Sequence, residues 1–226
     1  MLRRVEAEPE DQLAVFSDAT WTRIKAHGRF LAADANDLIL EYGQTDQDLM
    51  IILQGKTTLA YVQDGKTVPT AIYRTEGEVL HHAGMHLQIS NPFQIFAVDP
   101  GTRVVMINRD DVYRLISKDV AFAEFLFKDL SERFMTALGY LREQRQDPLI
   151  IRLAKRLLTI TKHSPAVQFT QAELAEILAV TRISISKAIK ALEEQGLVQR
   201  VERSRISVNR EALQTWLKQQ LETNVS

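Results

Sequence analysis

The fold of the C-terminal part of this chain is decided by residues 170–196, which read TQAELAEILAVTRISISKAIKALEEQG. Thr170, followed three residues later by Glu173, forms a capping box, which marks the start of a helix. Thr181 is a second N-cap residue, and Gly196 stands where a helix ends in a left-handed turn. Apolar residues recur at helical spacing between these signals. The sequence therefore predicts two helices joined by a tight turn.

Two short strands with several basic residues follow the second helix. Residues 197–201 and 205–208 alternate apolar and polar side chains, as the strands of a hairpin do. Two helices and a hairpin in this order predict a winged helix-turn-helix, whose second helix lies in the major groove of DNA. The rival interpretation is a small helical bundle with a solvated charged face. The two caps, the glycine stop and the basic hairpin together favour DNA binding.

The second helix, from Arg182 to Gln195, is expected to touch base edges with the residues near its start. Arginine and lysine donate to guanine O6 and N7, and an aliphatic side chain packs against the thymine methyl group. We expect the base-reading residues to be Arg182, Ile183, Ser184, Ser186 and Lys187. Phosphate contacts position a protein without specifying a sequence. We expect the phosphate-binding residues to be Thr170, Thr181, Lys190, Arg200, Arg203 and Arg205.

Charge is divided unevenly along the 226 residues. Residues 1–146 carry a net charge of −5 and residues 147–226 a net charge of +4, which indicates a nucleic-acid-binding C-terminal end. The chain has no cysteine, which excludes disulfides, thiolate-bound iron–sulfur clusters and zinc fingers. No apolar run approaches the roughly 18 residues of a membrane span, and the first residues do not read as a signal peptide. We therefore expect a cytoplasmic protein without membrane contact.

The first half of the chain has the pattern of a β-sandwich or barrel. Gly43, Gly55, Gly65 and Gly77 recur every 10 to 12 residues, with short apolar runs between them. Short strands with glycine corners are typical of these folds. One or two short helices are expected within residues 11–26. The predicted strands are residues 38–40, 49–53, 57–62, 68–73, 95–98 and 103–107.

Residues 38–43, 50–55 and 77–78 resemble the β-roll of the cyclic-AMP receptor and fumarate-nitrate regulator family, and residues 169–208 resemble its DNA-binding domain. The resemblance covers nearly the whole chain. It implies an α+β fold: an N-terminal β-roll (a cyclic-nucleotide-binding-like jelly roll), a long dimerisation helix and a C-terminal winged helix-turn-helix. It also implies a bacterial, homodimeric transcription regulator that reads a palindromic site on double-stranded DNA. We expect domains at residues 1–117, 118–146 and 147–226.

Residues 117–145 contain no proline and predict one long helix, which Pro148 ends. Apolar residues recur in it at alternating spacings of three and four, the pattern of a short coiled coil. An intrachain core would give the same stripe, but a twofold DNA site needs two recognition helices, which favours a homodimer. The residues of this dimer seam are Phe127, Leu130, Phe134, Ala137 and Leu141.

The segment after Glu78 departs from the family's nucleotide-binding pattern. Pro92 and Phe93 stand where the cyclic-nucleotide binders have Arg followed by Ser or Thr, and no Arg or Lys lies between Glu78 and Arg103. A cyclic phosphate would lack its counter-charge, so we expect no binding of cyclic AMP. Four alternatives stay open: haem, a metal ion held by a histidine-rich turn, a small apolar effector, or a side-chain-filled core with constitutive DNA binding. The candidate pocket residues are His81, His82, His86, Met85, Phe93 and Leu138.

The recognition helix departs from the family as well. Family members commonly begin it with Arg-Glu, and the glutamate accepts from cytosine N4, whereas this chain has Arg182 and Ile183. We therefore expect a half-site other than the TGTGA of the cyclic-AMP receptor. No nucleophile–base motif, phosphate loop or metalloprotease motif is present, so we expect no enzymatic activity. RNA polymerase is a further candidate partner, through the loop of residues 163–167.

Overall fold

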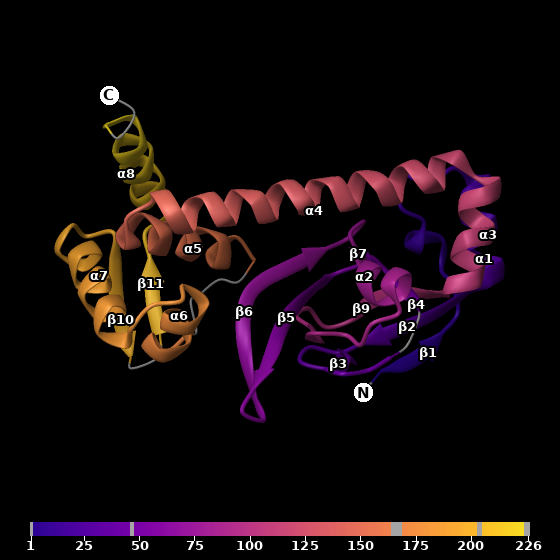
Figure 1. Cartoon of the computed structure of the whole chain (residues 1–226), viewed down its shortest axis with the longest axis horizontal. Coiled ribbons are helices and arrows are strands. Elements are labelled where there is room, and N and C mark those ends of the chain that lie inside the picture. Colours follow the sequence, from indigo (N-terminus) through magenta and orange to yellow (C-terminus); the bar gives the residue numbers. More distant parts are fainter. Residues whose placement is uncertain (1, 46–47, 164–168, 203–204, 224–226) are drawn as a thin grey trace. The chain divides into compact units, whose positions relative to one another are not determined.

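A computed structural model of the chain describes residues 2–45, 48–163, 169–202 and 205–223. Its contacts divide the chain into two compact units, Met1–Thr136 and Ala137–Ser226. The division falls within one long helix, α4 (Val120–Gln146). The first unit combines two sheets with helices, and the second is helical with a two-stranded hairpin (Figure 1). These elements confirm the predicted α+β class.

Two antiparallel sheets form the body of the first unit, with the strand orders β1-β2-β9-β4-β7 and β3-β8-β5-β6. All of the predicted strands are present, whereas β1, β2 and β7 were not predicted. The first sheet consists of β1 (Arg3–Val5), β2 (Gly28–Ala33), β4 (Asp48–Gln54), β7 (Val79–Leu80) and β9 (Thr102–Asn108). The second consists of β3 (Leu38–Leu40), β5 (Lys56–Gln63), β6 (Lys66–Thr75) and β8 (Gln94–Ala97).

Strand β4 is covered on both faces, which explains why residues 49–53 are an unbroken apolar run instead of an alternating one. Successive side chains of a strand point to opposite faces. Leu49, Ile51 and Leu53 pack with aromatic residues of the helices, including Trp21 and Phe122. Met50 and Ile52 instead pack with side chains from the second sheet. Two cores on either side of one strand therefore hold the unit together.

Helices cover the outer face of the first sheet, and one break between them was not predicted. They are η1 (Pro9–Asp11), α1 (Asp18–His27), α3 (Arg109–Lys118) and the start of α4. The helix expected from Ser117 is interrupted at Asp119, which has an extended backbone. The Asp119 carboxylate accepts from the backbone N–H of Phe122 at 3.2 Å, and Thr20 and Arg23 of α1 donate to it at 2.8 and 2.7 Å. Asp119 therefore starts α4 as an N-cap and ties it to α1.

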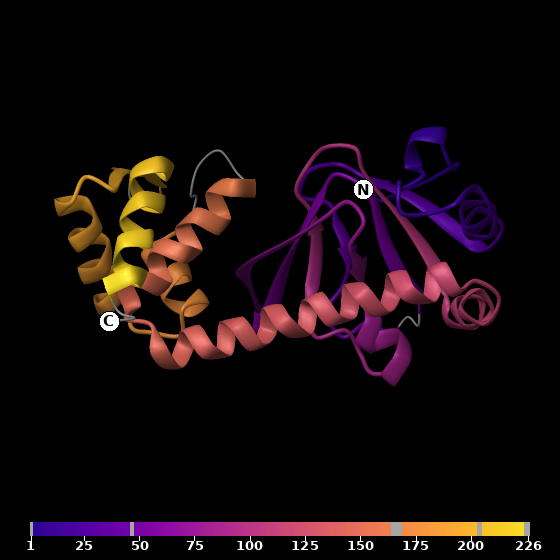
Figure 2. The ribbon, with the colours of Figure 1, turned by 90° about the horizontal axis from the view of Figure 1, so that it is seen from above.

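The histidine-rich segment was predicted as a turn, but it forms a short helix, α2 (His82–Leu87). Left-handed residues stand on either side of it, His81 with φ 66° and Gln88 with φ 55°. These two reversals separate α2 from β7 and from the segment that leads to β8. The helix lies beside α4 in both views (Figures 1 and 2). One turn of α4 therefore comes within reach of both α2 and the edge of the first sheet.

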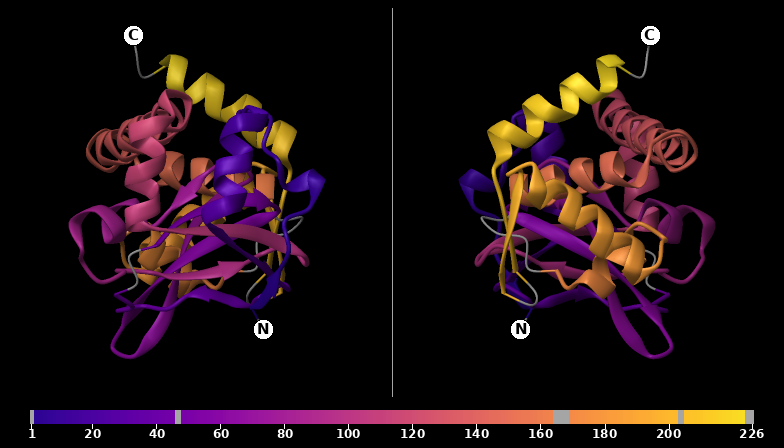
Figure 3. Two further views of the ribbon diagram at one scale, coloured as in Figure 1. Left: turned by 90° about the vertical axis from the view of Figure 1, so that its right-hand side faces the viewer. Right: turned by 90° about the vertical axis from the view of Figure 1, so that its left-hand side faces the viewer.

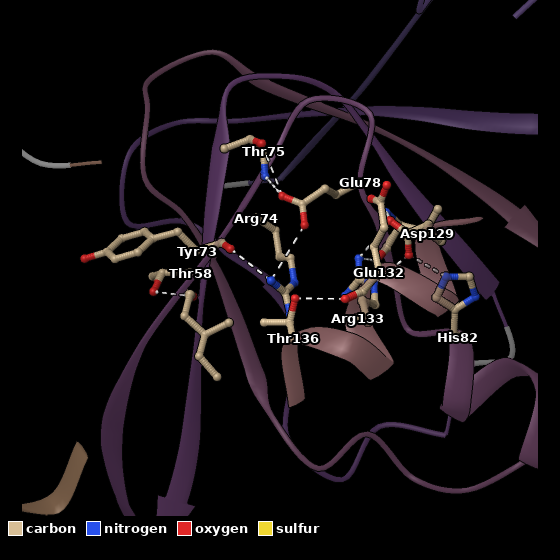
Figure 4. Close-up of polar contacts among 12 residues, drawn as sticks. Thr58, Tyr73, Arg74, Thr75, Glu78, His82, Asp129, Glu132, Arg133 and Thr136 are labelled. Atoms are coloured by element: carbon tan, nitrogen blue, oxygen red, sulfur yellow. Dashed lines mark hydrogen bonds and ion pairs between the residues drawn. The ribbon is translucent and has the colours of Figure 1, made fainter. Parts of the chain in front are cut away.

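Asp129 and Arg133, one turn apart on α4, clasp the backbone of Val79 at that edge (Figure 4). The Asp129 carboxylate accepts from the Val79 N–H at 3.0 Å, and the Arg133 guanidinium donates to the Val79 carbonyl. Arg133 Nε also donates to Asp129 at 2.5 Å, and His82 Nε2 lies 2.9 Å from the same carboxylate. Side chains thus satisfy backbone groups that an edge strand leaves unpaired.

The second unit contains α5 (Leu149–His163), α6 (Gln171–Ile177), α7 (Arg182–Glu194), β10 (Val198–Glu202), β11 (Arg205–Val208) and α8 (Arg210–Thr223) (Figure 3, right). Its core is formed by α5, α6 and α7 with side chains such as Leu157, Leu174 and Ile189, all fully buried. Helix α8 was not predicted. Its start is capped by Asn209, whose side chain accepts from the Ala212 N–H at 3.2 Å, and Leu213 anchors it in the core.

Helices α6 and α7 end in the same backbone motif with different residues at its left-handed position. In α7 the Leu197 N–H donates to the Leu192 carbonyl at 3.0 Å across Gly196, which has φ 70°. In α6 the Val180 N–H donates to the Ala175 carbonyl at 2.9 Å across Ala179, which has φ 52°. A left-handed backbone costs an L-residue with a β-carbon free energy that glycine avoids. The turn between α6 and α7 therefore carries local strain.

We expect Ala179→Gly and Gly196→Ala to shift stability in opposite directions. Glycine at position 179 relieves the strained backbone and should raise the free energy of unfolding by up to about 1 kcal/mol. Alanine at position 196 has open space for its β-carbon, so its cost of about 1 kcal/mol comes from φ alone. Urea unfolding followed by circular dichroism measures both. A loss of stability in Ala179→Gly would contradict the assignment of backbone strain to Ala179.

Asp129 should make stability depend on pH in the acid range. Burial raises the pKa of Asp129, but hydrogen bonds from His82 and Arg133, the charge of Arg133 and the Val79 N–H outweigh it and lower the pKa from 3.8 to about 2. A carboxyl whose pKa is lowered by folding stabilises the fold above its unfolded pKa, and this contribution is lost as the pH falls through the folded pKa. We expect roughly 2 kcal/mol to disappear between about pH 4 and pH 2.

The variant Asp129→Asn isolates this contribution, because it cannot titrate. Urea unfolding near neutral pH and at acid pH should show a weaker pH dependence in Asp129→Asn than in the wild type. Asp34→Asn is the control, since Asp34 is an exposed carboxylate paired with the exposed Arg3 at 3.4 Å. If the free energy of unfolding fell equally at acid pH in the wild type and in Asp129→Asn, the pH dependence could not be assigned to Asp129.

Candidate nucleic-acid interface and effector pocket

The start of α7 is built by its cap and its buried face. Thr181 has an extended backbone, and its hydroxyl accepts from the Ser184 N–H at 3.2 Å. The two hydroxyls of Thr181 and Ser184 also lie 2.9 Å apart. One side of the helix is buried in the core of the unit through Ile185, Ile189 and Leu192. The opposite side is therefore presented outward from a fixed first turn.

Three of the five residues expected to read bases are exposed on α7, and the other two are partly covered. Arg182, Ile183 and Lys187 are exposed, and Ser184 and Ser186 are half-buried. Ile183 is 70% exposed, although it is a large apolar side chain on the first turn of a packed helix. Burial does not explain an isoleucine at this position. A partner that offers an apolar group, such as a thymine methyl, would explain it.

Several residues expected to contact phosphates already have partners within the unit. Thr170 caps α6, where its hydroxyl accepts from the Glu173 N–H at 3.2 Å and donates to the Glu173 carboxylate at 2.8 Å. Thr181 caps α7 in the same way. Lys190 is exposed, and its ammonium lies 3.8 Å from Glu194.

Arg200 on the wing is paired with Glu193, a residue that was not predicted from the sequence to be part of the interface. The Glu193 carboxylate accepts from both the Arg200 guanidinium and the Arg200 backbone N–H, each at 2.9 Å. Glu193 therefore joins the end of α7 to strand β10. Arg203 lies outside the described residues, and so do the side chain of Arg205 and most of the loop proposed to contact RNA polymerase.

The first unit contains a cavity of about 1110 Å³ between β5, β6, β8, α2 and the first half of α4. Most of its lining is apolar, and it includes Leu59, Ile72, Leu80, Met85, Phe93 and Leu126. Five of the six predicted pocket residues line it: His81, His82, His86, Met85 and Phe93. Leu138 belongs to the second unit and does not line it. A cavity of this size argues against the side-chain-filled core.

The three histidines do not converge on one point. His81 Nδ1 lies 3.1 Å from the Asp48 carbonyl, His82 Nε2 lies 2.9 Å from Asp129, and His86 Nδ1 lies 2.8 Å from the Tyr113 hydroxyl. Among the described residues, no group of three His, Cys, Asp or Glu side chains could hold a metal ion. The geometry therefore gives no support to a metal site made of this histidine cluster.

Gly84 is required by the position of His81. A carbonyl oxygen only accepts, so the neutral His81 ring carries its proton on Nδ1. Its buried Nε2 has no hydrogen-bond partner among the residues that the structure describes, and it lies against Gly84, where a β-carbon would come within 1.7 Å of it. Helix α2 thus covers the free nitrogen of His81.

Two arginines line the cavity from elements distant in sequence (Figure 4). Arg74 comes from β6 and Arg133 from α4, so a search of residues 79–102 could not find them. Both are paired with carboxylates. Arg133 is bonded to Asp129, and the Arg74 guanidinium lies 3.6 Å from Glu78. The expectation that the pocket has no cation is therefore wrong. Two arginines line the cavity, and neighbouring carboxylates balance their charges.

Comparison with known proteins agrees with this architecture. A family model described as the Crp-like helix-turn-helix domain matches residues 151–216. No curated protein sequence matches the chain. No helix in the described part of the chain is both long and apolar enough to cross a membrane.

The fold is shared with solved regulators at low sequence identity. A transcriptional regulator of the crp/fnr family from Eubacterium rectale is 16% identical, with a TM-score of 0.68 over 90% of this chain and 95% of that chain. The c-di-GMP-responsive regulator CLP of Xanthomonas campestris is 13% identical, with a TM-score of 0.65 over 85% and 99%. A CRP/FNR-family regulator from Thermus thermophilus is 18% identical, with a TM-score of 0.63 over 84% and 98%. The chain therefore contains a Crp-like helix-turn-helix domain in residues 151–216 and has the fold of these solved regulators.

Proposed function

We propose that the chain is a homodimer that reads a palindromic operator with α7 and responds to a ligand in the cavity of its first unit. The observation that carries the DNA part is the exposed first turn of α7 within a Crp-like helix-turn-helix domain. Arg182 and Lys187 donate to guanine, and Ile183 packs against a thymine methyl. Ser184 and Ser186 add shorter contacts, and phosphates are bound by Lys190, Arg200, Arg203 and Arg205.

Dimerisation is supported by the exposed face of α4. Phe127, Phe134 and Leu141 are 72%, 63% and 62% exposed, and Leu130 is 49% exposed. Large apolar side chains at coiled-coil spacing lose contact with water when a second copy of the helix packs against them. An intrachain core would have buried these residues. The exposure of this stripe therefore supports the proposed dimer over an intrachain core.

The cavity is the proposed effector site, and cyclic AMP is not its proposed ligand. Its inner cations already have carboxylate partners, so a cyclic phosphate would compete with Asp129 and Glu78 for them. Removing the partner of a buried charge is strongly unfavourable.

We expect Ile183→Glu to change the base preference at one position of each half-site. A carboxylate accepts from cytosine N4, whereas the wild-type isoleucine favours thymine, and a good base contact is worth about 1–3 kcal/mol. Selection from random duplexes should return a half-site other than TGTGA for the wild type. Competition gel shifts should then show a change toward cytosine of about tenfold or more in the variant.

Ile183→Val is the matched control, because valine retains an aliphatic contact with the thymine methyl. Wild-type affinity for the selected site should fall steeply between about 50 and 200 mM salt, as phosphate contacts require. An unchanged preference in Ile183→Glu would rule out Ile183 as a base-reading residue. Affinity that does not depend on salt would rule out the whole interface.

We expect Phe134→Glu to separate the two subunits. A charge in an apolar seam has to lose its water in the dimer but not in the monomer, so the equilibrium should move toward monomers. Sedimentation equilibrium at micromolar concentration should give a dimer for the wild type and mainly a monomer for the variant. Thr136→Glu is the control, because Thr136 is exposed on α4 outside the seam. A monomeric wild type would refute the dimer.

A further inference from the structure

The arginine and lysine side chains around the cavity are each paired with a carboxylate of the chain. Asp129 is buried, with 8% of its side chain exposed, and it binds Arg133, His82 and the Val79 N–H at once. Arg74 is held by Glu78 at 3.6 Å and donates to the Tyr73 carbonyl at 3.2 Å. Lys128, at the rim, is 77% exposed and lies 4.0 Å from Glu132. Every cation on the wall therefore has a carboxylate neighbour, and Glu124 adds a further negative charge to the lining.

Arg133 uses its Nε and one Nη for Asp129 and Val79, so an anionic ligand that took these donors would displace Asp129. The Asp129 carboxylate would then keep a buried negative charge without its main counter-ion, which is strongly unfavourable. Exchange would also break the clasp on Val79, because the same guanidinium donates to the Val79 carbonyl.

An uncharged ligand meets none of these costs. The wall between the pairs is made of side chains such as Leu59, Ile72 and Phe93, which favour apolar surface. The cavity, at about 1110 Å³, is slightly larger than the roughly 300–1,000 Å³ of usual small-molecule sites, so it has room for a molecule of considerable size.

We propose that this cavity selects an uncharged, predominantly apolar molecule and rejects carboxylates and phosphates of similar size. The proposal rests on the proposed function of the cavity as the effector site and names the chemical class of the effector. Arg133 holds α4 against β7 through its bond to the Val79 carbonyl. Because carboxylates balance the charges of Arg74 and Arg133, the wall offers an anion no net positive charge. We call this exclusion of anions the charge filter.

A matched pair of ten-carbon molecules tests the charge filter. The neutral fluorophore N-phenyl-1-naphthylamine is bound to the full-length protein near neutral pH and displaced with decanol, with decanoate or with cyclic AMP. We expect decanol to displace it at a concentration at least about tenfold lower than decanoate, and cyclic AMP not to displace it. Equal displacement by decanol and decanoate would overturn the proposal, and so would failure of the fluorophore to bind.

Two further variants test the cause and the place. Asp129→Asn leaves Arg133 without its carboxylate, so decanoate should gain at least about tenfold relative to decanol. Ala123→Phe adds a ring to the lining from α4 and should weaken binding of the fluorophore, whereas Ala121→Phe, on the same helix but outside the lining, should not. An unchanged preference in Asp129→Asn would refute the filter.

Gel shifts and sedimentation of the same samples separate this proposal from the proposed function. DNA binding by a dimer that does not bind the fluorophore would refute the ligand class and leave the DNA-reading function intact. If the wild type neither bound DNA nor formed a dimer, the proposed function itself would be refuted.

Discussion

The clasp of Asp129 and Arg133 on Val79 is the interaction on which the first unit depends. Strand β7 is only two residues long and stands at the edge of its sheet, so its backbone needs partners other than a neighbouring strand. A carboxylate and a guanidinium from one helical turn supply them. Because the carboxylate also receives His82, the same group fixes α2 and α4 together. The cavity between these helices and the second sheet is a consequence of that arrangement.

Features of the fold that depend on neighbouring residues were predictable from the sequence. Strand period, glycine corners, the Thr170 capping box and the Gly196 helix end are all local patterns, and the structure has each of them. The break at Asp119 was missed because helical spacing continues across it. Its cause lies about a hundred residues away, in Thr20 and Arg23 of α1, which hold the capping carboxylate.

The sites were predictable to different degrees for the same reason. The residues proposed to read bases lie within six consecutive positions at the start of α7, so their closeness follows from the sequence alone. The pair of Glu193 and Arg200 spans the turn into the wing, and no helical or strand period relates the two. The cavity arginines are further apart still, on β6 and α4. A lack of cations between residues 79 and 102 was true of the segment but not of the site.

The pairing of cations separates the two sites in chemical terms. Arg74 and Arg133 line the cavity and are already paired with carboxylates. A bound anion would therefore gain little electrostatic attraction there and would disrupt a buried network of ion pairs. Arg182 and Lys187 form no ion pair with any described residue and are exposed at the start of α7. Such cations would meet the proposed DNA partner with their charge uncompensated. Arg200 lies between these cases: its pair with Glu193 is at the surface, where an ion pair contributes little and phosphate can replace the carboxylate. On the proposals above, cations repel or attract an anion according to whether the chain supplies a buried counter-ion, as it does for Arg133 and does not for Arg182 among the described residues.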